Sequence, residues 1–267
     1  MTLNFNVVIP ARLSSTRLPG KPLLPIAGKP MVVRVAEQVA KSGAQQIWIA
    51  TDHQSIIAAV HEHGFKACLT HTSHLSGTDR IAQVVEQLQW PDDTIVVNVQ
   101  GDEPLMPPKL IRAVALYLHT HPQCAIATAC HAIHDEQTMR NPNVVKVVMD
   151  KQGNALYFSR APIPYPRDLF PSPASGGAKA RKSEEGMLPA GLPVMRHIGI
   201  YAYRASFLRE FGLLEPAPIE KTEVLEQLRA LWHGYKIGVT ISAEAPPSGV
   251  DTEQDLHAAR KLFDGGV

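Results

Sequence analysis

The stretch Val7-Val8-Ile9-Pro10-Ala11-Arg12-Leu13-Ser14-Ser15-Thr16-Arg17-Leu18-Pro19-Gly20-Lys21-Pro22 carries the strongest signal for the fold. It begins in an apolar run, residues 5–9, that predicts a buried strand. Four prolines between positions 10 and 25 keep the segment after the strand non-helical and stiff. Arg12, Arg17 and Lys21 place three positive charges on it. A stiff loop with cations and free N–H groups after a strand suits a polyanion such as a nucleoside triphosphate.

Considered alone, this loop has two open interpretations: a phosphate-binding loop, or a surface turn with solvated charges. It is not a Walker A motif, because Ser15 stands where that motif needs its first glycine and Pro22 where it needs serine or threonine. It also lacks the glycine spacing of the GxGxxG dinucleotide motif. The common ATPase and dinucleotide interpretations therefore lose their best support.

The composition excludes other classes of protein. The 267 residues are 45% hydrophobic, which suffices for a large core in one big domain or in one domain with an added lobe. A formal net charge of +1 provides no global field for nucleic acid or an anionic membrane. No apolar run approaches the roughly 18–20 residues of a membrane span. Three cysteines without a CxxC spacing favour reduced thiols, and the N-terminus shows no export signature, so we expect a cytoplasmic protein without nucleic-acid or membrane partners.

Strand and helix patterns alternate through the first half of the chain. The apolar runs predict strands at 5–9, 46–50, 94–99 and 125–130, and helices at 31–41, 54–63, 78–88 and 108–118. This alternation predicts an α/β fold with a mainly parallel central sheet and helices on both faces. Ligands of such sheets bind beyond the carboxyl ends of the strands. The first loop, Thr51-Asp52 and Gln100-Gly101-Asp102 all fall at those ends, which favours a nucleotide site there.

The second half of the chain has a different pattern. Strands are predicted at 144–149, 155–159, 198–203 and 236–242, and helices at 222–233 and 252–263. The first two strands flank a turn at 150–154 and predict a hairpin. Residues 171–191 are rich in Pro, Gly, Ser, Ala and Lys, which predicts a mobile loop.

Two aspartates are candidate metal ligands. Asp102 directly follows a predicted buried strand, and Gly101 allows close backbone approach, so Asp102 can serve either Mg²⁺ or a turn before a helix. Asp251 precedes the last predicted helix, and Gln254 stands at its third position. From spacing alone an N-cap role of Asp251 is favoured, although one oxygen can cap while the other binds metal.

The remaining polar candidates are weaker. Ser76 or Thr78 can cap the helix that contains Arg80, whose N-terminus would then face a ligand. Arg80 and Arg160 suit an anionic partner, but a surface ion pair is the slightly favoured role for each. The pair Glu226-Gln227 lies on a predicted helix, where a polar pair is usually solvated.

Nine blocks of sequence, in order from residue 7 to about residue 262, match one family: Ile9-Pro10-Ala11-Arg12, Ser15-Thr16-Arg17-Leu18-Pro19-Gly20-Lys21-Pro22, Ala50-Thr51-Asp52, Ser76-Gly77-Thr78, Asn98-Val99-Gln100-Gly101-Asp102-Glu103-Pro104, Tyr157-Phe158-Ser159-Arg160, Arg196-His197-Ile198-Gly199-Ile200-Tyr201, Leu225-Glu226-Gln227-Leu228-Arg229 and Gly249-Val250-Asp251-Thr252. They resemble the 3-deoxy-manno-octulosonate cytidylyltransferases, also called CMP-Kdo synthetases. Nine blocks in register are far more specific than any single one.

The resemblance implies a Rossmann-like nucleotidyltransferase fold of the glycosyltransferase A type, with a smaller inserted acceptor and dimerisation lobe. It implies a Mg²⁺-dependent homodimer that transfers CMP from CTP to the sugar acid Kdo, for lipopolysaccharide synthesis in a Gram-negative cytoplasm. We expect a nucleotide-binding part at 1–140, a sugar-binding and dimerisation part at 141–250, and a C-terminal helix at 251–267 that returns to the nucleotide site. These boundaries are soft within a single compact unit.

The resemblance also assigns residues to roles. By this likeness Arg12 and Lys21 would hold the CTP phosphates, and Asp102 and Asp251 would hold Mg²⁺. The pocket for the nucleotide would include Ala11, Arg12, Lys21, Ser76, Gly77, Thr78, Arg80 and Asp102. The pocket for the sugar acid would include Gln100, Arg160, His197, Glu226 and Gln227. The chain departs from shorter members of the family at 171–191, which concerns the cover over the sugar rather than the phosphate chemistry.

Three alternatives remain open at the level of sequence. An N-acylneuraminate cytidylyltransferase has a similar N-terminal loop and also activates an acidic sugar. A non-catalytic sensor on the same fold would bind CTP without releasing pyrophosphate. A metal-dependent glycosyltransferase of related fold would consume a sugar nucleotide, and the spacing of Arg12 and Lys21 argues against it.

Overall fold

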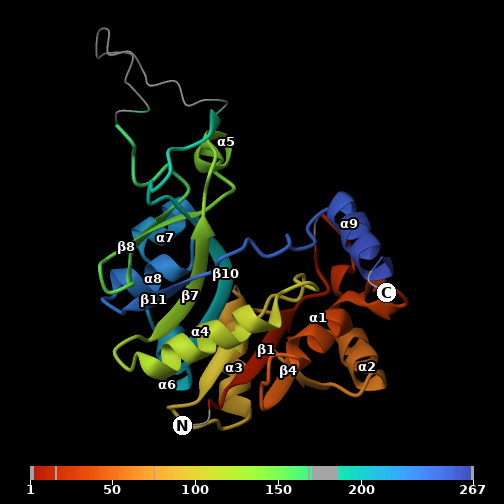
Figure 1. Ribbon diagram of the computed structural model, residues 1–267. Helices are drawn as coiled ribbons and strands as arrows, with labels where there is room; N and C mark the ends of the chain where they lie inside the picture. The colour runs from red at the N-terminus through yellow and green to blue at the C-terminus, as the bar shows by residue number, and fades with distance from the viewer. Residues whose placement is uncertain (1–2, 16, 75, 168, 170–185, 266–267) are drawn as a thin grey trace.

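The computed structural model describes residues 3–15, 17–74, 76–167, 169 and 186–265. Its centre is a nine-stranded sheet in the order β11-β7-β10-β6-β1-β4-β5, which β8 and β9 extend from β10 (Figure 1). The strands are β1 (Asn6–Ala11), β4 (Gln46–Thr51), β5 (Lys66–Leu69), β6 (Ile95–Asn98), β7 (Ile126–Ala132), β8 (Lys146–Met149), β9 (Ala155–Ser159), β10 (Met195–Arg204) and β11 (Ile237–Ile241).

Most neighbouring strands of the central path are parallel. β1 lies between β4 and β6 and runs parallel to both, β5 continues parallel to β4, and β11 is parallel to β7. β10 is the exception, because it runs antiparallel to β6 on one side and to β7 on the other. The predicted α/β fold with a mainly parallel sheet is therefore confirmed, and the predicted hairpin at 144–159 is the antiparallel pair β8 and β9.

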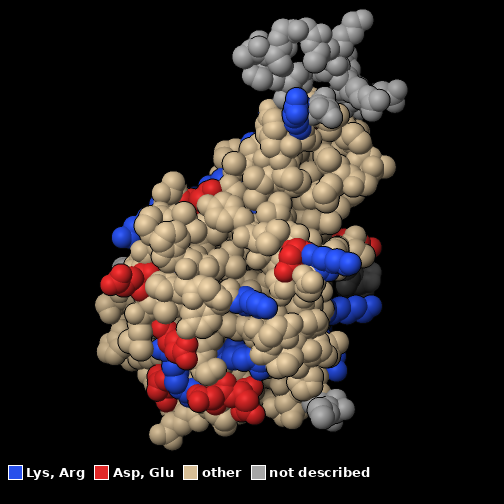
Figure 2. Space-filling view, turned by 90° about the vertical axis from the view of Figure 1, so that its left-hand side faces the viewer, with Lys and Arg blue, Asp and Glu red and all other residues tan. Residues whose placement is uncertain are grey.

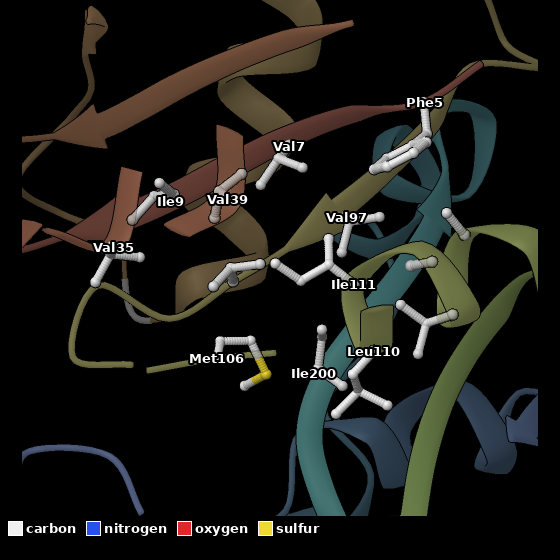
Figure 3. Packing of buried hydrophobic residues seen from close by; sticks show 14 of the residues in the cluster. Phe5, Val7, Ile9, Val35, Val39, Val97, Met106, Leu110, Ile111 and Ile200 are labelled. Carbon is white, nitrogen blue, oxygen red and sulfur yellow. The ribbon is translucent and has the colours of Figure 1, made fainter. Parts of the chain in front are cut away.

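Helices cover both faces of the sheet because its strands are apolar on both sides. On one face α1 (Met31–Ala40), α2 (Gln54–Glu62) and α4 (Pro108–Thr120) pack on Val7 and Ile9 of β1. On the other face α3 (Gly77–Gln87) and α6 (Ala205–Phe211) share a second core with Val8, the residue between them. Figure 3 shows the first core, with Val7 and Ile9 near α1 and Val97 next to Ile111 of α4.

One of the helices predicted from the sequence is wrong. The segment predicted as a single helix at 222–233 forms two short helices, α7 (Pro218–Glu223) and α8 (Gln227–Trp232). They are separated at Val224, whose φ of 53° lies in the left-handed region that β-branched residues rarely adopt. The other predicted helices and strands in the described chain agree with the structure to within a few residues.

The N-terminal loop was predicted to be non-helical, but it is not wholly so. It contains a single 3₁₀ turn, η1 (Lys21–Leu23), with Pro22 near its start, where a missing N–H costs nothing. A small hairpin of β2 (Pro25–Ile26) and β3 (Lys29–Pro30) follows, and α1 begins at Met31, directly after Pro30.

The C-terminal helix α9 (Glu253–Asp264) returns to the N-terminal part of the chain. Figure 1 shows the segment after β11 crossing to α9, which lies beside α1. Arg260 Nε donates to the carbonyl oxygen of Pro25 at 2.9 Å, and the guanidinium of Arg34 lies 5.1 Å from the ring centre of Phe263. These contacts bring Asp251, which precedes α9, close to the N-terminal loop.

The remaining features concern the surface. Residues 171–185 of the predicted mobile loop lie outside the described residues, and α5 (Glu136–Arg140) precedes them in the chain. None of the helices in the described part of the chain combines the length and apolar character needed to cross a membrane. The face seen in Figure 2 carries acidic and basic side chains side by side, in keeping with the net charge of +1.

The packing of α4 on the sheet is directly testable at Ile111, which is fully buried. We expect Ile111→Ala to lower the free energy of unfolding by about 2–5 kcal/mol, because it removes apolar contacts and leaves a cavity. Lys109→Ala, at an exposed position of the same helix, is the matched control and should change it by less than about 0.5 kcal/mol. Urea denaturation measures both, and equal stability of the two variants would contradict this core.

Candidate functional site

The loops that follow β1 and β6 meet the N-terminus of α3 and the residue before α9 around one cleft. The cleft has a volume of about 400 Å³. Its lining residues are Pro10, Ala11, Arg12, Ser14, Ser15, Arg17, Lys21, Pro22, Gly77, Gln100, Gly101, Asp102 and Asp251. Residues from five separate sequence blocks therefore lie together, at the carboxyl ends of β1 and β6.

Lys21 is at the centre of this cleft. Its ammonium group donates to Asp102 Oδ2 at 2.6 Å, to Asp251 Oδ1 at 3.0 Å and to the carbonyl oxygen of Val250 at 3.0 Å. Burial lowers the pKa of Lys21, but the hydrogen bonds and charges of Asp102 and Asp251 outweigh it and raise the pKa above the ordinary value. The side chain therefore stays charged at neutral pH.

The two aspartates converge on one cation, the ammonium group of Lys21. Asp251 is not the N-cap of α9, contrary to the expectation from spacing. Thr252 is the cap, and its Oγ1 accepts from Asp255 N at 3.2 Å. The carboxylate of Asp251 is consequently available to Lys21 and to Arg17, whose Nη2 lies 3.1 Å from Asp251 Oδ1.

Two carboxylates are a suitable but incomplete donor set for Mg²⁺. Among the described residues no group of three or more His, Cys, Asp or Glu is arranged to hold a metal ion. Mg²⁺ commonly binds through one or two carboxylates and takes its other oxygens from phosphates and water. The ammonium group of Lys21 already occupies a place between Asp102 and Asp251, so the position favours a cation.

The N-terminus of α3 forms another wall of the cleft. Ser76 caps this helix, with its Oγ accepting from Asp79 N at 3.1 Å while Asp79 Oδ2 accepts from Ser76 N at 3.2 Å. Gly77 follows and lines the cleft, where the positive end of the helix dipole favours a negative ligand. The predicted role of Ser76 as a cap is confirmed.

Arg80 is fully buried rather than a partner in a surface ion pair. Its Nη2 donates to Asp52 Oδ2 at 2.8 Å, and its Nη1 donates to Thr70. Burial lowers the pKa of Arg80, as does the charge of Arg12, while Asp52 opposes that shift. Arg80 does not line the cleft and lies on α3 behind the Ser76-Gly77 turn.

A second pocket, of about 220 Å³, adjoins the cleft and shares Gly77 and Gln100 with it. Its other lining residues are Thr78, Asn98, Ile126, Tyr201, Tyr203, Phe211, Glu226 and Gln227. Glu226 Oε1 and Gln227 Nε2 are buried and have no hydrogen-bond partner in the described part of the protein. Burial raises the pKa of the Glu226 carboxyl. The pocket thus offers uncommitted polar groups to a ligand beside the phosphate cleft.

His197 is half-buried and contacts Tyr201, which lines this pocket. Its Nε2 is 2.9 Å from Thr128 Oγ1, and its ring contacts Phe158 and Tyr201. Burial lowers the pKa of His197 to about 3, so the ring is neutral at physiological pH. It also lines a third pocket, of about 320 Å³, which reaches Asp102 and Asp251 from the other side.

Arg160 lies apart from the other predicted sugar-binding residues. Its Nε donates to the carbonyl oxygen of Glu223 at 2.7 Å and its Nη1 to that of Pro142 at 3.0 Å. It lines neither the cleft nor the second pocket.

Several residues that line these pockets were not assigned by sequence reasoning, among them Asn98, Tyr201 and Glu103. Asn98 and Tyr201 line the second pocket and stand inside sequence blocks that match the family, so their place in the sequence was a usable signal. Glu103 directly follows Asp102 in the chain. It lines the third pocket together with Asp102, and burial, followed by the charges of Asp102 and Asp251, raises its pKa to about 7.

Gly101 brings the β6 loop against the first loop. A Cβ atom at this position would lie 2.8 Å from the carbonyl oxygen of Pro10, closer than real Cβ contacts. We expect Gly101→Ala to lower the free energy of unfolding by about 1–3 kcal/mol, because one of the two backbones must shift. A Cβ atom at Gly212 would have no neighbour within 4 Å, so Gly212→Ala is the matched control. Chemical denaturation tests the pair, and an unchanged Gly101→Ala protein would contradict the close approach.

Because the pKa of Glu103 is raised, we expect Glu103→Gln to stabilise the free protein by an amount that depends on pH. Between the ordinary pKa of 4.5 and the folded value of about 7, the unfolded chain releases this proton while the folded chain keeps it. This group therefore makes the folded state less stable as the pH rises through that window. The melting temperature of Glu103→Gln relative to the parent should rise from pH 5 to pH 8. Glu62→Gln, on the exposed surface, should show no such trend; a flat difference for Glu103→Gln would refute its buried state.

Known proteins resemble this chain both in sequence and in structure. The family model described as "Cytidylyltransferase" matches residues 6–237. A solved structure titled CMP:2-keto-3-deoxy-manno-octonic acid synthetase complexed with CTP is 38% identical, and the match covers 99% of this chain and 100% of that one, with a TM-score of 0.85. The resemblance predicted from the nine sequence blocks is therefore confirmed.

A more distant solved structure shares the fold alone. It is a cytidylyltransferase from Leptospira borgpetersenii serovar Hardjo-bovis (strain JB197), 15% identical, with a TM-score of 0.60 over 100% of this chain and 89% of that one. The family model matches most of the chain, and the 38% identity extends over its whole length. The chain therefore belongs to the cytidylyltransferase family.

Proposed function

We propose that this protein transfers CMP from CTP to the anomeric hydroxyl of 3-deoxy-D-manno-octulosonate (Kdo), releasing pyrophosphate and forming CMP-Kdo for lipopolysaccharide synthesis. The observation that carries the proposal is the junction at Lys21. There a cleft lined with cations meets two carboxylates, directly beside a polar pocket large enough for a small sugar acid. The similarity to a CMP-Kdo synthetase that binds CTP supports the choice of substrates.

Phosphoryl transfer of this kind requires positioning and charge more than covalent help from the protein. The anomeric hydroxyl attacks the α-phosphorus in line, and the bond to pyrophosphate breaks. Arg12 lines the cleft, and no carboxylate in the described chain forms an ion pair with it, so its charge is available to the phosphates. Each charged hydrogen bond from Arg12 or Lys21 contributes roughly 1.5–3 kcal/mol, and it accelerates the reaction where it forms mainly in the transition state.

We propose Mg²⁺ as the cofactor, held by Asp102 and Asp251. When bound there, it would stabilise the phosphoryl oxygens and lower the pKa of the attacking hydroxyl. The triphosphate competes with both carboxylates for the ammonium group of Lys21 and so makes these carboxylates available to another cation. Lys21 therefore links the arrival of the nucleotide to the exposure of the two aspartates.

The second pocket is the proposed site of Kdo. Gln100, which lines both spaces, stands between the nucleotide and the sugar acid. The unpartnered Oε1 of Glu226 and Nε2 of Gln227 offer an acceptor and a donor for sugar hydroxyls. Recognition of a polyhydroxylated acid needs such groups, because a site that hydrogen-bonds a hydroxyl rejects analogues that lack it.

We also propose that the protein is a homodimer that acts in the cytoplasm. Large apolar side chains on two strands at one end of the sheet remain exposed, Leu156 of β9 by 62% and Ile241 of β11 by 59%. Exposed apolar side chains on strands that lack an outer neighbour are suited to contact with a second copy.

The experiment that tests the function measures pyrophosphate release from CTP with Mg²⁺, with and without Kdo. We expect release that requires Kdo and falls when UTP or ATP replaces CTP. Asp102→Asn and Lys21→Ala should each lose most of this activity while the protein still folds, as its circular dichroism spectrum would show. Lys29→Ala, whose ammonium group pairs with Glu37 outside the cleft, is the matched control and should keep full activity.

Each other result has a distinct meaning. Release with an N-acylneuraminate and none with Kdo would replace the proposed acceptor. CTP binding without release for either acid would indicate a sensor instead of an enzyme. Full turnover in Asp102→Asn or Lys21→Ala would remove the roles assigned to those side chains.

A further inference from the structure

We propose that Glu223 is a positioning residue for the sugar-acid pocket: its carboxylate ties the end of β9 to the break between α7 and α8 and so holds Glu226 and Gln227 in the pocket wall. This rests on the proposed function only in naming the ligand of the pocket. Glu223 itself lines neither the cleft nor the pocket, so it acts through other residues.

Glu223 makes three hydrogen bonds to the end of β9. Its Oε1 accepts from Ser159 Oγ at 2.6 Å, and its Oε2 accepts from Arg160 N at 2.9 Å. Its own carbonyl oxygen accepts from Arg160 Nε at 2.7 Å. Both carboxylate oxygens and the main chain of Glu223 are therefore fixed to a strand of the central sheet.

The end of β9, to which Glu223 is hydrogen-bonded, is also held by Lys146. Lys146 is fully buried, and its ammonium group donates to the carbonyl oxygens of Arg160 at 2.6 Å, Val144 at 2.6 Å and Asn141 at 3.0 Å. Burial lowers the pKa of Lys146, and the negative charge of Glu223 opposes that shift. Glu223 thus balances the charges of Lys146 and Arg160, which makes a carboxylate preferable to a neutral side chain here.

The chain immediately after Glu223 is strained. Val224 adopts a φ of 53°, a left-handed conformation that is sterically unfavourable for a β-branched residue. Such a conformation persists only where surrounding contacts hold it. The contacts in question are those of Glu223, together with a hydrogen bond of 3.5 Å from Arg160 Nη2 to the carbonyl oxygen of Val224.

This left-handed turn determines the direction of the residues that follow. It interrupts a helix that the sequence pattern would continue, and it places the side chain of Leu225 in the core. Glu226 and Gln227 come next and line the pocket with their unpartnered polar atoms. Without the turn, a continuous helix would rotate both side chains to other directions, because each residue adds about 100° around a helix.

The test separates the affinity for Kdo from the affinity for CTP. For Glu223→Gln we expect the KM for Kdo to rise about tenfold or more, since small misplacements of binding groups are costly, while the KM for CTP stays within about twofold. Ser159→Ala keeps the charge balance and removes one of the three bonds, so it should raise the KM for Kdo by a smaller factor. Lys221→Gln, at an exposed position on α7 and with a charge change of the same size but opposite sign, is the control.

Amide hydrogen exchange of residues 224–230 provides a readout that needs no substrate. Exchange in this segment should be faster in Glu223→Gln than in the parent and unchanged in Lys221→Gln. A parallel rise in both KM values, or a lower active fraction with both KM values unchanged, would indicate a merely structural role and overturn the proposal. So would unchanged exchange and an unchanged KM for Kdo.

Failure of this inference is distinguishable from failure of the proposed function. If the parent protein turns over no Kdo, the function fails, and hydrogen exchange still decides whether Glu223 orders the segment. If the parent is active and Glu223→Gln keeps the same KM for Kdo, the function stands and the positioning role is refuted.

Discussion

The ammonium group of Lys21 holds together three parts of the chain that are far apart in sequence. It joins the first loop to Asp102, 81 residues away, and to Asp251, 230 residues away. Two carboxylates this close repel each other unless a cation lies between them. In the free protein the chain supplies that cation itself, with Arg17 adding a second contact to Asp251. A triphosphate is the one ligand class that both attracts Lys21 and brings its own cation, so the same charges that hold the empty site together also prepare it for the nucleotide.

The topology of the sheet explains why these residues can meet. β1 and β6 are adjacent and parallel, so the loops after them emerge at the same edge. The long strand β10 runs the opposite way between β6 and β7, and it carries Tyr201 and His197 past the same edge. α9 then returns across the first loop. The phosphate cleft and the polar pocket are therefore neighbours because of strand order, not because of any single motif.

Sequence patterns predicted every strand of the central sheet except β5, the longer helices and the grouping of residues at the cleft, because apolar periodicity and strand ends are local signals. They were one residue wrong at the α9 cap, since Asp251 and Thr252 are both good caps and only the bond to Asp255 distinguishes them. They missed the break at Val224 altogether. No local preference favours a left-handed valine, and the contacts that stabilise it come from β9, more than 60 residues earlier. Local rules fail in this way where function constrains the backbone.

The cleft and the pocket differ in how they use charge, and this difference suits their ligands. The cleft relies on permanent charges of Arg12, Lys21 and two aspartates, which match the fixed charges of phosphates. The pocket wall carries amide, hydroxyl and phenol groups, the apolar side chains of Ile126 and Phe211, and one carboxyl, that of Glu226. The half-buried His197 beside it stays neutral because its pKa is about 3. Neutral donors and acceptors distinguish sugar hydroxyls by geometry, whereas charges attract any anion. A site that must choose one sugar acid in the presence of free phosphates gains selectivity by confining its lysine and arginine side chains to the cleft.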